Sequence, residues 1–159
     1  FSAKVRSVSN TLISIPNSLL MAKEYTLTIL KPDAIKKNCA CEILSLISQN
    51  EFRIAALKMV QLSLNQAKSF YKEHEGKEFY EKLVDFMTSG PVMVVLLEKD
   101  NAVGDFRKLI GKTDPEKAEE GTVRKIYGTN QRENAVHGSD CNENAQREAD
   151  FFFSQLERF

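Results

Sequence analysis

The segment NAVHGSD, residues 134–140, contains one of only two histidines in the chain. His137 lies where a short predicted strand ends, and Gly138 follows it, so its imidazole can face a cleft. A neutral imidazole is a good nucleophile at physiological pH. His137 is therefore the first candidate for covalent chemistry, with a structural histidine as the alternative.

A carboxylate in the last predicted helix is the second candidate. Glu148 shares the i, i+3, i+4 spacing of an apolar stripe with Ala145, Ala149 and Phe152. A carboxylate at that position needs a partner, because burying an unpaired charge is unfavourable. If Glu148 accepts a hydrogen bond from one ring nitrogen of His137, the other nitrogen keeps its lone pair toward the cleft. The alternative is a Glu148 that is solvated or paired with an arginine.

Three cations form the third group, namely Lys31 at a strand end, Arg107 on a helix and Arg124 on a short helix. Each alone is interpreted as a surface charge. Together they would suit a polyphosphate, because arginine matches phosphate oxygens in a bidentate way and lysine supplies a point charge. The chain has no GxxxxGK[ST] or GxGxxG loop, so side chains must hold the phosphates.

Composition excludes several other classes of protein. Lys plus Arg and Asp plus Glu are both 22, so no broad basic field attracts nucleic acid or a membrane. The sequence has no apolar run long enough to span a bilayer. Its three cysteines fit neither a disulfide framework nor a metal knuckle, which favours reduced thiols and a cytoplasmic location. His74 has no partners at metal-ligand spacing and is expected at the surface.

Residues 1–20 differ from the rest, with serines, one Lys, one Arg and no acid. This composition fits an organellar transit segment, translation upstream of Met21, or a remnant of cloning. We therefore predict one domain over residues 21–159, and 42% hydrophobic residues are enough for its core.

From residue 25 the pattern becomes regular. Strands are predicted over 25–31, over 52–62 with Phe52, Ile54 and Ala56 facing the core, over 91–99, and finally into His137. Helices are predicted over 39–50, from Ser63 or Asn65 to 74, and over 77–90, 102–111, 122–127 and 142–156. Two strand-helix-strand passes predict an α+β protein, a ferredoxin-like α/β sandwich with helices on one side of a mostly antiparallel four-stranded sheet.

Six segments, in order, resemble the nucleoside diphosphate kinase family: ILKPDAI, FYKEH, FMTSGPV, GTVRKIYG, NAVHGSD and NAQREADFFF. The resemblance covers Met21 to about Phe153. It implies a ferredoxin-like subunit that moves the terminal phosphate of a nucleoside triphosphate to a nucleoside diphosphate by a ping-pong route through a phosphohistidine.

The resemblance also implies a role for each matching residue. His137 matches the phosphorylated histidine, Glu148 the acid that orients it, and Ser139 the adjacent serine. Asp140 matches the acid that meets Mg²⁺ through water. Phosphate and sugar contacts are implied for Lys31, Tyr71, Arg107, Thr113, Arg124 and Asn134, and base contacts for Phe79 and Leu83.

Two positions depart from the family pattern. Gln131 replaces a usual apolar residue beside the base, and Lys112 adds a positive charge near the phosphates. The resemblance further implies a homo-oligomer, with a hexamer favoured over a tetramer.

Two other classes of protein compete with the enzyme. A module that binds nucleotide without turnover would take up no phosphate on His137. A scaffold or nucleic-acid-binding protein would need an external surface that this neutral sequence does not indicate.

Overall fold

The computed structural model describes residues 24–159, so the predicted leader, residues 1–20, lies outside the described residues. Four strands and seven α-helices follow one another along the described chain. In chain order they are β1 (Tyr25–Leu30), α1 (Pro32–Lys36), α2 (Ala40–Gln49), β2 (Arg53–Val60), α3 (Leu64–Phe70), α4 (Tyr80–Thr88), β3 (Val92–Glu98), α5 (Ala102–Ile110), α6 (Val123–Tyr127), β4 (Val136–Gly138) and α7 (Asn142–Phe152). Short 3₁₀ turns occupy Lys72–His74, Pro115–Lys117 and Gln155–Glu157.

The strands form one antiparallel sheet in the order β2-β3-β1-β4. β1 pairs with β3 along its whole length, from Tyr25 opposite Glu98 to Leu30 opposite Met93, and with β4 on its other edge. The first strand-helix-strand pass joins β1 to β2 and the second joins β3 to β4, with β3 inserted between the first two strands. This topology confirms the predicted α+β, ferredoxin-like class.

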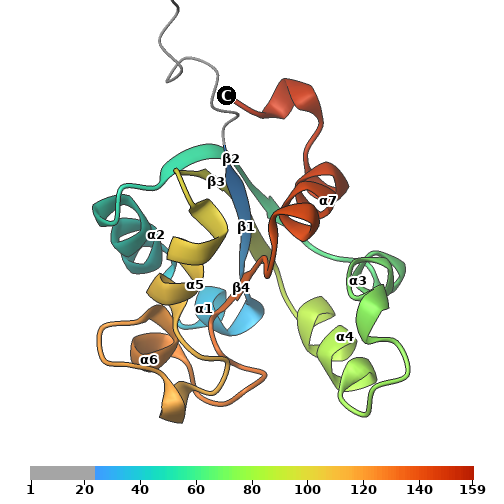
Figure 1. The fold of residues 1–159 in the computed structure, drawn as a ribbon. Coiled ribbons are helices and arrows are strands. Elements are labelled where there is room, and N and C mark those ends of the chain that lie inside the picture. Colours follow the sequence, from blue (N-terminus) through green and yellow to red (C-terminus); the bar gives the residue numbers. More distant parts are fainter. Residues whose placement is uncertain (1–23) are drawn as a thin grey trace, which may run out of the picture.

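Helices cover both faces of the sheet, so the expectation of helices on one side was wrong (Figure 1). Leu27 and Ile29 of β1 face a core cluster that includes Met87 of α4 and Phe152 of α7. Leu30 faces the opposite cluster with side chains of α2, α5 and α6. The helices α3 and α4, inserted between β2 and β3, cover the face of Leu27 and Ile29 together with α7. Both sides of the central strands are therefore buried.

The predicted alternation in the second strand was wrong at Ile54, whereas Phe52 and Ala56 are buried as predicted. A β-bulge interrupts the pairing of β2 with β3 between Ile54 and Ala56, and it turns Ile54 outward to 39% exposure while Ala55 and Ala56 are both buried. An extra residue in one strand shifts every following side chain to the other face, so a strict period of two fails. The carbonyl of Ala55 accepts a hydrogen bond from the N–H of the last residue, Phe159, at 2.9 Å.

Several helix ends follow the predicted signals. Ser63 caps α3 in a capping box with Gln66, and Gly111 ends α5 with φ of 81°. The last helix ends at Phe152, earlier than predicted, and α1 was not predicted. No helix among residues 24–159 is long and apolar enough to cross a membrane.

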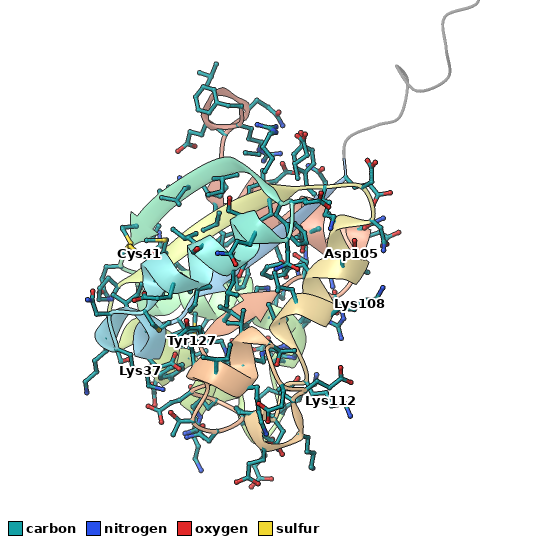
Figure 2. All side chains as sticks on the ribbon, turned by 90° about the vertical axis from the view of Figure 1, so that its left-hand side faces the viewer. Lys37, Cys41, Asp105, Lys108, Lys112 and Tyr127 are labelled. Carbon is teal, nitrogen blue, oxygen red and sulfur yellow. The ribbon has the colours of Figure 1, made fainter. Side chains whose placement is uncertain are left out.

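The loop that leads into β4 is tied to the helix α1. The ammonium of Lys37 donates to the carbonyl of Tyr127 at 2.8 Å and to the hydroxyl of Thr129 at 2.7 Å. Figure 2 shows Lys37 and Tyr127 next to each other on one side of the molecule. Asn130 continues this anchoring, since its side-chain oxygen accepts hydrogen bonds from two backbone N–H groups of the loop.

Candidate active site

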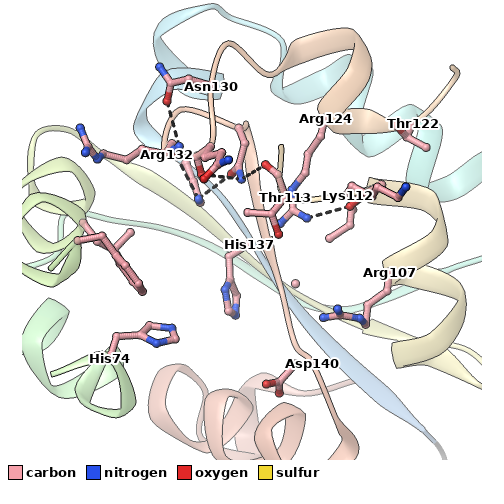
Figure 3. Close-up of a pocket in the computed structure, with 18 of the residues that line it drawn as sticks. His74, Arg107, Lys112, Thr113, Thr122, Arg124, Asn130, Arg132, His137 and Asp140 are labelled. Carbon is pink, nitrogen blue, oxygen red and sulfur yellow. Dashed lines mark hydrogen bonds between the residues drawn. The ribbon is translucent and has the colours of Figure 1, made fainter. Parts of the chain in front are cut away.

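His137 lies in β4, opposite Ile29 of β1, at the floor of a cleft of about 1190 Å³. Its side chain is 20% exposed, and Figure 3 shows the ring in the middle of the cleft. The strand is short, but it is fixed because the Thr28 hydroxyl donates to the His137 carbonyl at 2.7 Å. The ring is thus presented to the cleft by a rigid strand.

Two glycines let the surrounding elements approach closely. A Cβ on Gly138 would lie 2.9 Å from Cδ1 of Ile110, so a larger residue would require side chains of α5 to shift. A Cβ on Gly111 would lie 2.5 Å from Oγ1 of Thr122, the residue that begins α6. The glycine after the histidine therefore suits the close contact of β4 with the side chains of α5.

Glu148 is buried behind the imidazole, with 2% exposure. Its Oε2 accepts a hydrogen bond from the Ser139 hydroxyl and lies 3.1 Å from Nε2 of His137. The ring N–H is not aligned with that oxygen, and Nε2 has no hydrogen-bond partner in the described chain, so the contact is an ion-pair distance rather than a hydrogen bond. The Leu27 N–H donates to Ser139, which is fully buried and lies outside the cleft lining. Ser139 thus contacts Glu148 from outside the cleft.

A strained turn precedes the histidine. Ala135 has φ of 70°, and the Val136 N–H donates to the Asn134 carbonyl at 2.9 Å, which together define a γ-turn. The N–H of Ala135 donates to Oδ2 of Asp33 at 3.0 Å, and its carbonyl accepts from the N–H of Lys31 at 2.9 Å. The segment that follows β1 therefore holds this turn in place.

Lys31 is 7% exposed and lies on the cleft wall. Its ammonium donates to Oδ1 of Asn134 at 2.7 Å and to the Arg132 carbonyl at 3.3 Å. Burial, and secondly the charge of Arg124, lower the pKa of Lys31 to about 7, although Asp33 raises it in part. An anion in the cleft would favour the charged form.

Arg124 and Arg107 extend toward the same cleft (Figure 3). The Arg124 guanidinium donates to the carbonyls of Gly111 and Val136 at 2.9 and 3.0 Å. Burial, and secondly the charge of Arg107, lower the pKa of Arg124 to about 10, so it remains charged at neutral pH. Its Nε is buried without a partner among the described residues. Two neighbouring guanidiniums repel each other until an anion lies between them.

Asn134 and Thr113 lie beside Lys31. Asn134 is 1% exposed, and its side-chain N–H group donates to the carbonyls of Thr113 and Gln131 at 2.9 and 3.0 Å. Its oxygen is the acceptor for Lys31, so every polar group of this amide has a partner within the protein. In the structure Asn134 holds the cleft wall together, and a direct sugar contact would require one of these bonds to be exchanged.

A row of rings leads from the histidine to the rim of the cleft. Centroid separations are 6.2 Å from His137 to Tyr71, 6.3 Å from Tyr71 to His74, and 5.5 Å from His74 to Phe79. Phe79 is 48% exposed, and Leu83 lines the cleft beside it. The cleft therefore has a cationic end at His137 and an apolar end at Phe79.

The expectation that His74 lies at the surface was wrong. A 3₁₀ turn directly after α3 brings His74 onto the same side as Tyr71, where it is half-buried and lines the cleft (Figure 3). Burial, and secondly Lys77, lower the pKa of His74. The hydroxyl of Tyr71 is buried without a partner among residues 24–159, and burial raises its pKa. Spacing alone did not distinguish His74 from a surface residue.

Asp140 lies across the cleft from His137, at the start of α7 (Figure 3). The Asn144 amide donates to its Oδ1 at 2.7 Å, and this bond is the main cause of the lowered pKa of Asp140. The carboxylate is therefore ionised at neutral pH. No group of three or more metal-ligating side chains occurs in the described part of the chain.

All the predicted site residues except Ser139 line this one cleft. Side chains distant in sequence thus converge, and their individual roles stay predictions. A ferredoxin-like sheet that presents an imidazole to a cleft with convergent cations is the arrangement expected of a phosphotransferase. Residues 24–158 match the family model for nucleoside diphosphate kinase. The chain belongs to the nucleoside diphosphate kinase family and is an enzyme.

Relatives and solved structures agree with this assignment. The nucleoside diphosphate kinases of Persephonella marina and Histophilus somni are 47% and 48% identical to the chain over 86% of its length, and the matches cover 98% and 97% of those proteins. The structure of the Aquifex aeolicus nucleoside diphosphate kinase has a TM-score of 0.84 at 42% identity and covers 87% of this chain and 100% of its own. The Halobacterium salinarum enzyme in complex with CDP has a TM-score of 0.83 at 32% identity and covers 87% and 92%.

Proposed function

We propose that this chain transfers the terminal phosphate of a nucleoside triphosphate to a nucleoside diphosphate through a phosphohistidine on His137. The observation that carries the proposal is the placement of a single imidazole within reach of a buried carboxylate, in a cleft lined by Lys31, Arg107 and Arg124. Cations there offset the charge of the moving phosphate, and a fixed ring keeps the attacking atom in line.

The chemical step follows from the two ring nitrogens. Nε2 lies 3.1 Å from Oε2 of Glu148, and the negative charge of this carboxylate favours a proton on Nε2, which leaves the lone pair on Nδ1. Nδ1 attacks the γ-phosphorus, the bond to the β-phosphate oxygen breaks, and the nucleoside diphosphate leaves with that oxygen. A second diphosphate then attacks the phosphohistidine, which restores the imidazole. Incubation with labelled triphosphate should leave acid-labile, base-stable phosphate on His137.

A magnesium ion is the proposed cofactor. Asp140 is an ionised carboxylate in the cleft, and hard oxygen donors of this kind suit Mg²⁺. The described residues supply no three-ligand cluster, which fits an ion carried mainly by the substrate phosphates and met by Asp140 through water. When bound, the ion supplies charge neutralisation on the polyphosphate.

Glu148→Gln is expected to slow the reaction without abolishing it. The amide keeps the shape of the side chain but removes the charge that stabilises the proton on Nε2. We expect phosphorylation of the enzyme to be about 10- to 100-fold slower, measured by rapid mixing with triphosphate. Ser139→Ala, which removes the hydrogen bonds of this hydroxyl to Glu148 and to the Leu27 backbone but keeps the Glu148 charge, should have a smaller effect. An unchanged rate in the glutamine variant would contradict the orienting role.

We also propose a homo-oligomer, with a hexamer favoured over a tetramer. β2 lies at the edge of the sheet, and Ile54, Leu57 and Met59 are 39%, 43% and 50% exposed on it. An apolar edge strand is a template for association with another chain. Leu57→Lys should give smaller species by light scattering at micromolar concentration, whereas Leu64→Lys, at an equally apolar exposed site on α3, should not. A monomeric wild type would contradict the proposal.

We propose that residues 21–159 form the nucleoside diphosphate kinase domain, in keeping with the family match over 24–158. A cytoplasmic location stays a prediction that rests on cysteine usage. All three cysteines, Cys39, Cys41 and Cys141, are free thiols.

A further inference from the structure

One further cation of the cleft, Arg132, has no role so far. Its side chain is exposed, and its guanidinium has no hydrogen bond or ion pair within residues 24–159. Its backbone is fixed, because its N–H donates to Oδ1 of Asn130 at 2.9 Å and its carbonyl accepts from Lys31 at 3.3 Å. A free guanidinium on a fixed backbone is ready to bind a ligand.

The direction of Arg132 separates it from the phosphate-binding cations. Figure 3 shows its side chain extending to the side of the cleft that carries His74 and away from Arg107. The row of rings places Phe79 beyond His74 on that side, at the apolar end of the cleft. With phosphates at His137, the base of a nucleotide lies at the end toward which Arg132 extends. This step rests on the proposed function.

The neighbouring side chain of Gln131 is partly committed to another contact. Its Nε2 donates to Oδ2 of Asp114 at 3.4 Å. An amide also carries both a donor and an acceptor, so it can pair with either kind of base substituent. Arg132 by contrast offers donors only. A donor-only group discriminates between bases at one position, because guanine presents O6 and uracil or thymine presents O4 as an acceptor there, while adenine and cytosine present an amino donor.

We propose that Arg132 makes the enzyme prefer nucleotides whose base carries a keto oxygen at C6 of a purine or C4 of a pyrimidine, namely guanine, uracil and thymine, over adenine and cytosine, which carry an amino group at that position. Stacking on Phe79 is indifferent to the base and provides the shared affinity. The guanidinium adds a contact to the C6 or C4 substituent, which an oxygen there accepts and an amino group there does not. Arg132 is thus a specificity-determining residue at the outer end of the cleft.

The test compares binding of GDP, ADP, UDP and CDP to wild type, Arg132→Met and Lys112→Met by calorimetry. Wild type should bind GDP about fivefold more tightly than ADP, and UDP more tightly than CDP, as expected for an exposed guanidinium contact. Arg132→Met should bring both ratios close to one. Lys112 is the matched control, an exposed cation that also lines the cleft but follows α5 on the side of Lys108 (Figure 2). Its replacement should weaken all four ligands alike and keep both ratios.

Three outcomes would overturn the assignment. Wild-type ratios near one would remove the preference, and ratios that survive in Arg132→Met would assign it to another residue. Equal weakening of all four ligands by Arg132→Met would mean that the guanidinium stacks on any base. Binding needs no turnover, so absence of phosphate on His137 would reject the proposed transfer and leave this measurement interpretable.

Discussion

Replacing His137 by alanine is expected to abolish phosphate exchange between ATP and a second nucleoside diphosphate, with a loss of at least about 10⁴-fold in kcat. The remaining cations still bind nucleotide, but none of them forms the covalent intermediate that a ping-pong route requires. Labelled ATP should therefore leave no acid-labile phosphate on the variant. Coupled exchange assays and autoradiography measure the two results independently.

The other histidine provides the matched control. His74 lies in the same cleft and next to Tyr71, but on the row of rings rather than beside Glu148. His74→Ala should still take up the label, even if nucleotide binding is weaker. Exchange that persists in His137→Ala, or label that disappears only in His74→Ala, would remove the proposed mechanism and leave the fold assignment intact.

Replacing Lys31 by methionine is expected to lower kcat/KM by about 10²- to 10³-fold. Methionine fills a similar volume, so the loss measures the charge on the cleft wall rather than its shape. Steady-state kinetics with ATP and a diphosphate acceptor test this. Lys37→Met is a suitable control, because Lys37 is an exposed lysine that contacts Tyr127 and Thr129 and lies outside the cleft lining. A similar loss in both variants would mean that the effect is not specific to Lys31.

The same variant separates stability from activity through pH. Folding lowers the pKa of Lys31 from 10.5 to about 7, so between these values the unfolded chain binds more protons than the folded one. The free energy of unfolding of wild type should therefore rise with pH across this window, whereas Lys31→Met lacks this contribution. Urea unfolding at pH 6 and pH 10 measures this difference. The free energy of unfolding of wild type, relative to that of Lys31→Met, should increase by on the order of a few kcal/mol from pH 6 to pH 10. Parallel pH profiles would show that the pKa of Lys31 is not depressed.

Local patterns predicted most of the fold. The strand at Tyr25 and the helix that begins after Ser63 have strong local signals, and both occur as expected. The bulge at Ile54 and the coverage of both sheet faces were missed, because both depend on how distant segments pack. Side-chain periodicity says which residues are apolar but not which neighbour will cover them.

The site was less accessible to pattern reasoning than the fold. The apolar stripe of Ala145, Ala149 and Phe152 placed Glu148 on or beside the core face of the last helix with solvation as the alternative, and the structure buries it. Convergence of Lys31 with Arg124 could not be predicted from spacing, because tertiary contacts alone bring them together; the family resemblance supplied it. The place of His74 in the cleft was missed for a local reason, because its position depends on the single tight turn at Lys72–His74.

The γ-turn at Ala135 has a consequence for how the nucleophile can vary. A left-handed backbone conformation is unfavourable for alanine, yet the methyl group of Ala135 is completely buried. The packing of this methyl group in the interior therefore outweighs the conformational strain at Ala135. Both peptide groups of this turn are fastened to the segment at Asp33, and Asn134 and His137 flank it. The side chains of Asn134 and His137 are consequently positioned by the same hydrogen bonds, and a displacement of one residue would displace the other as well.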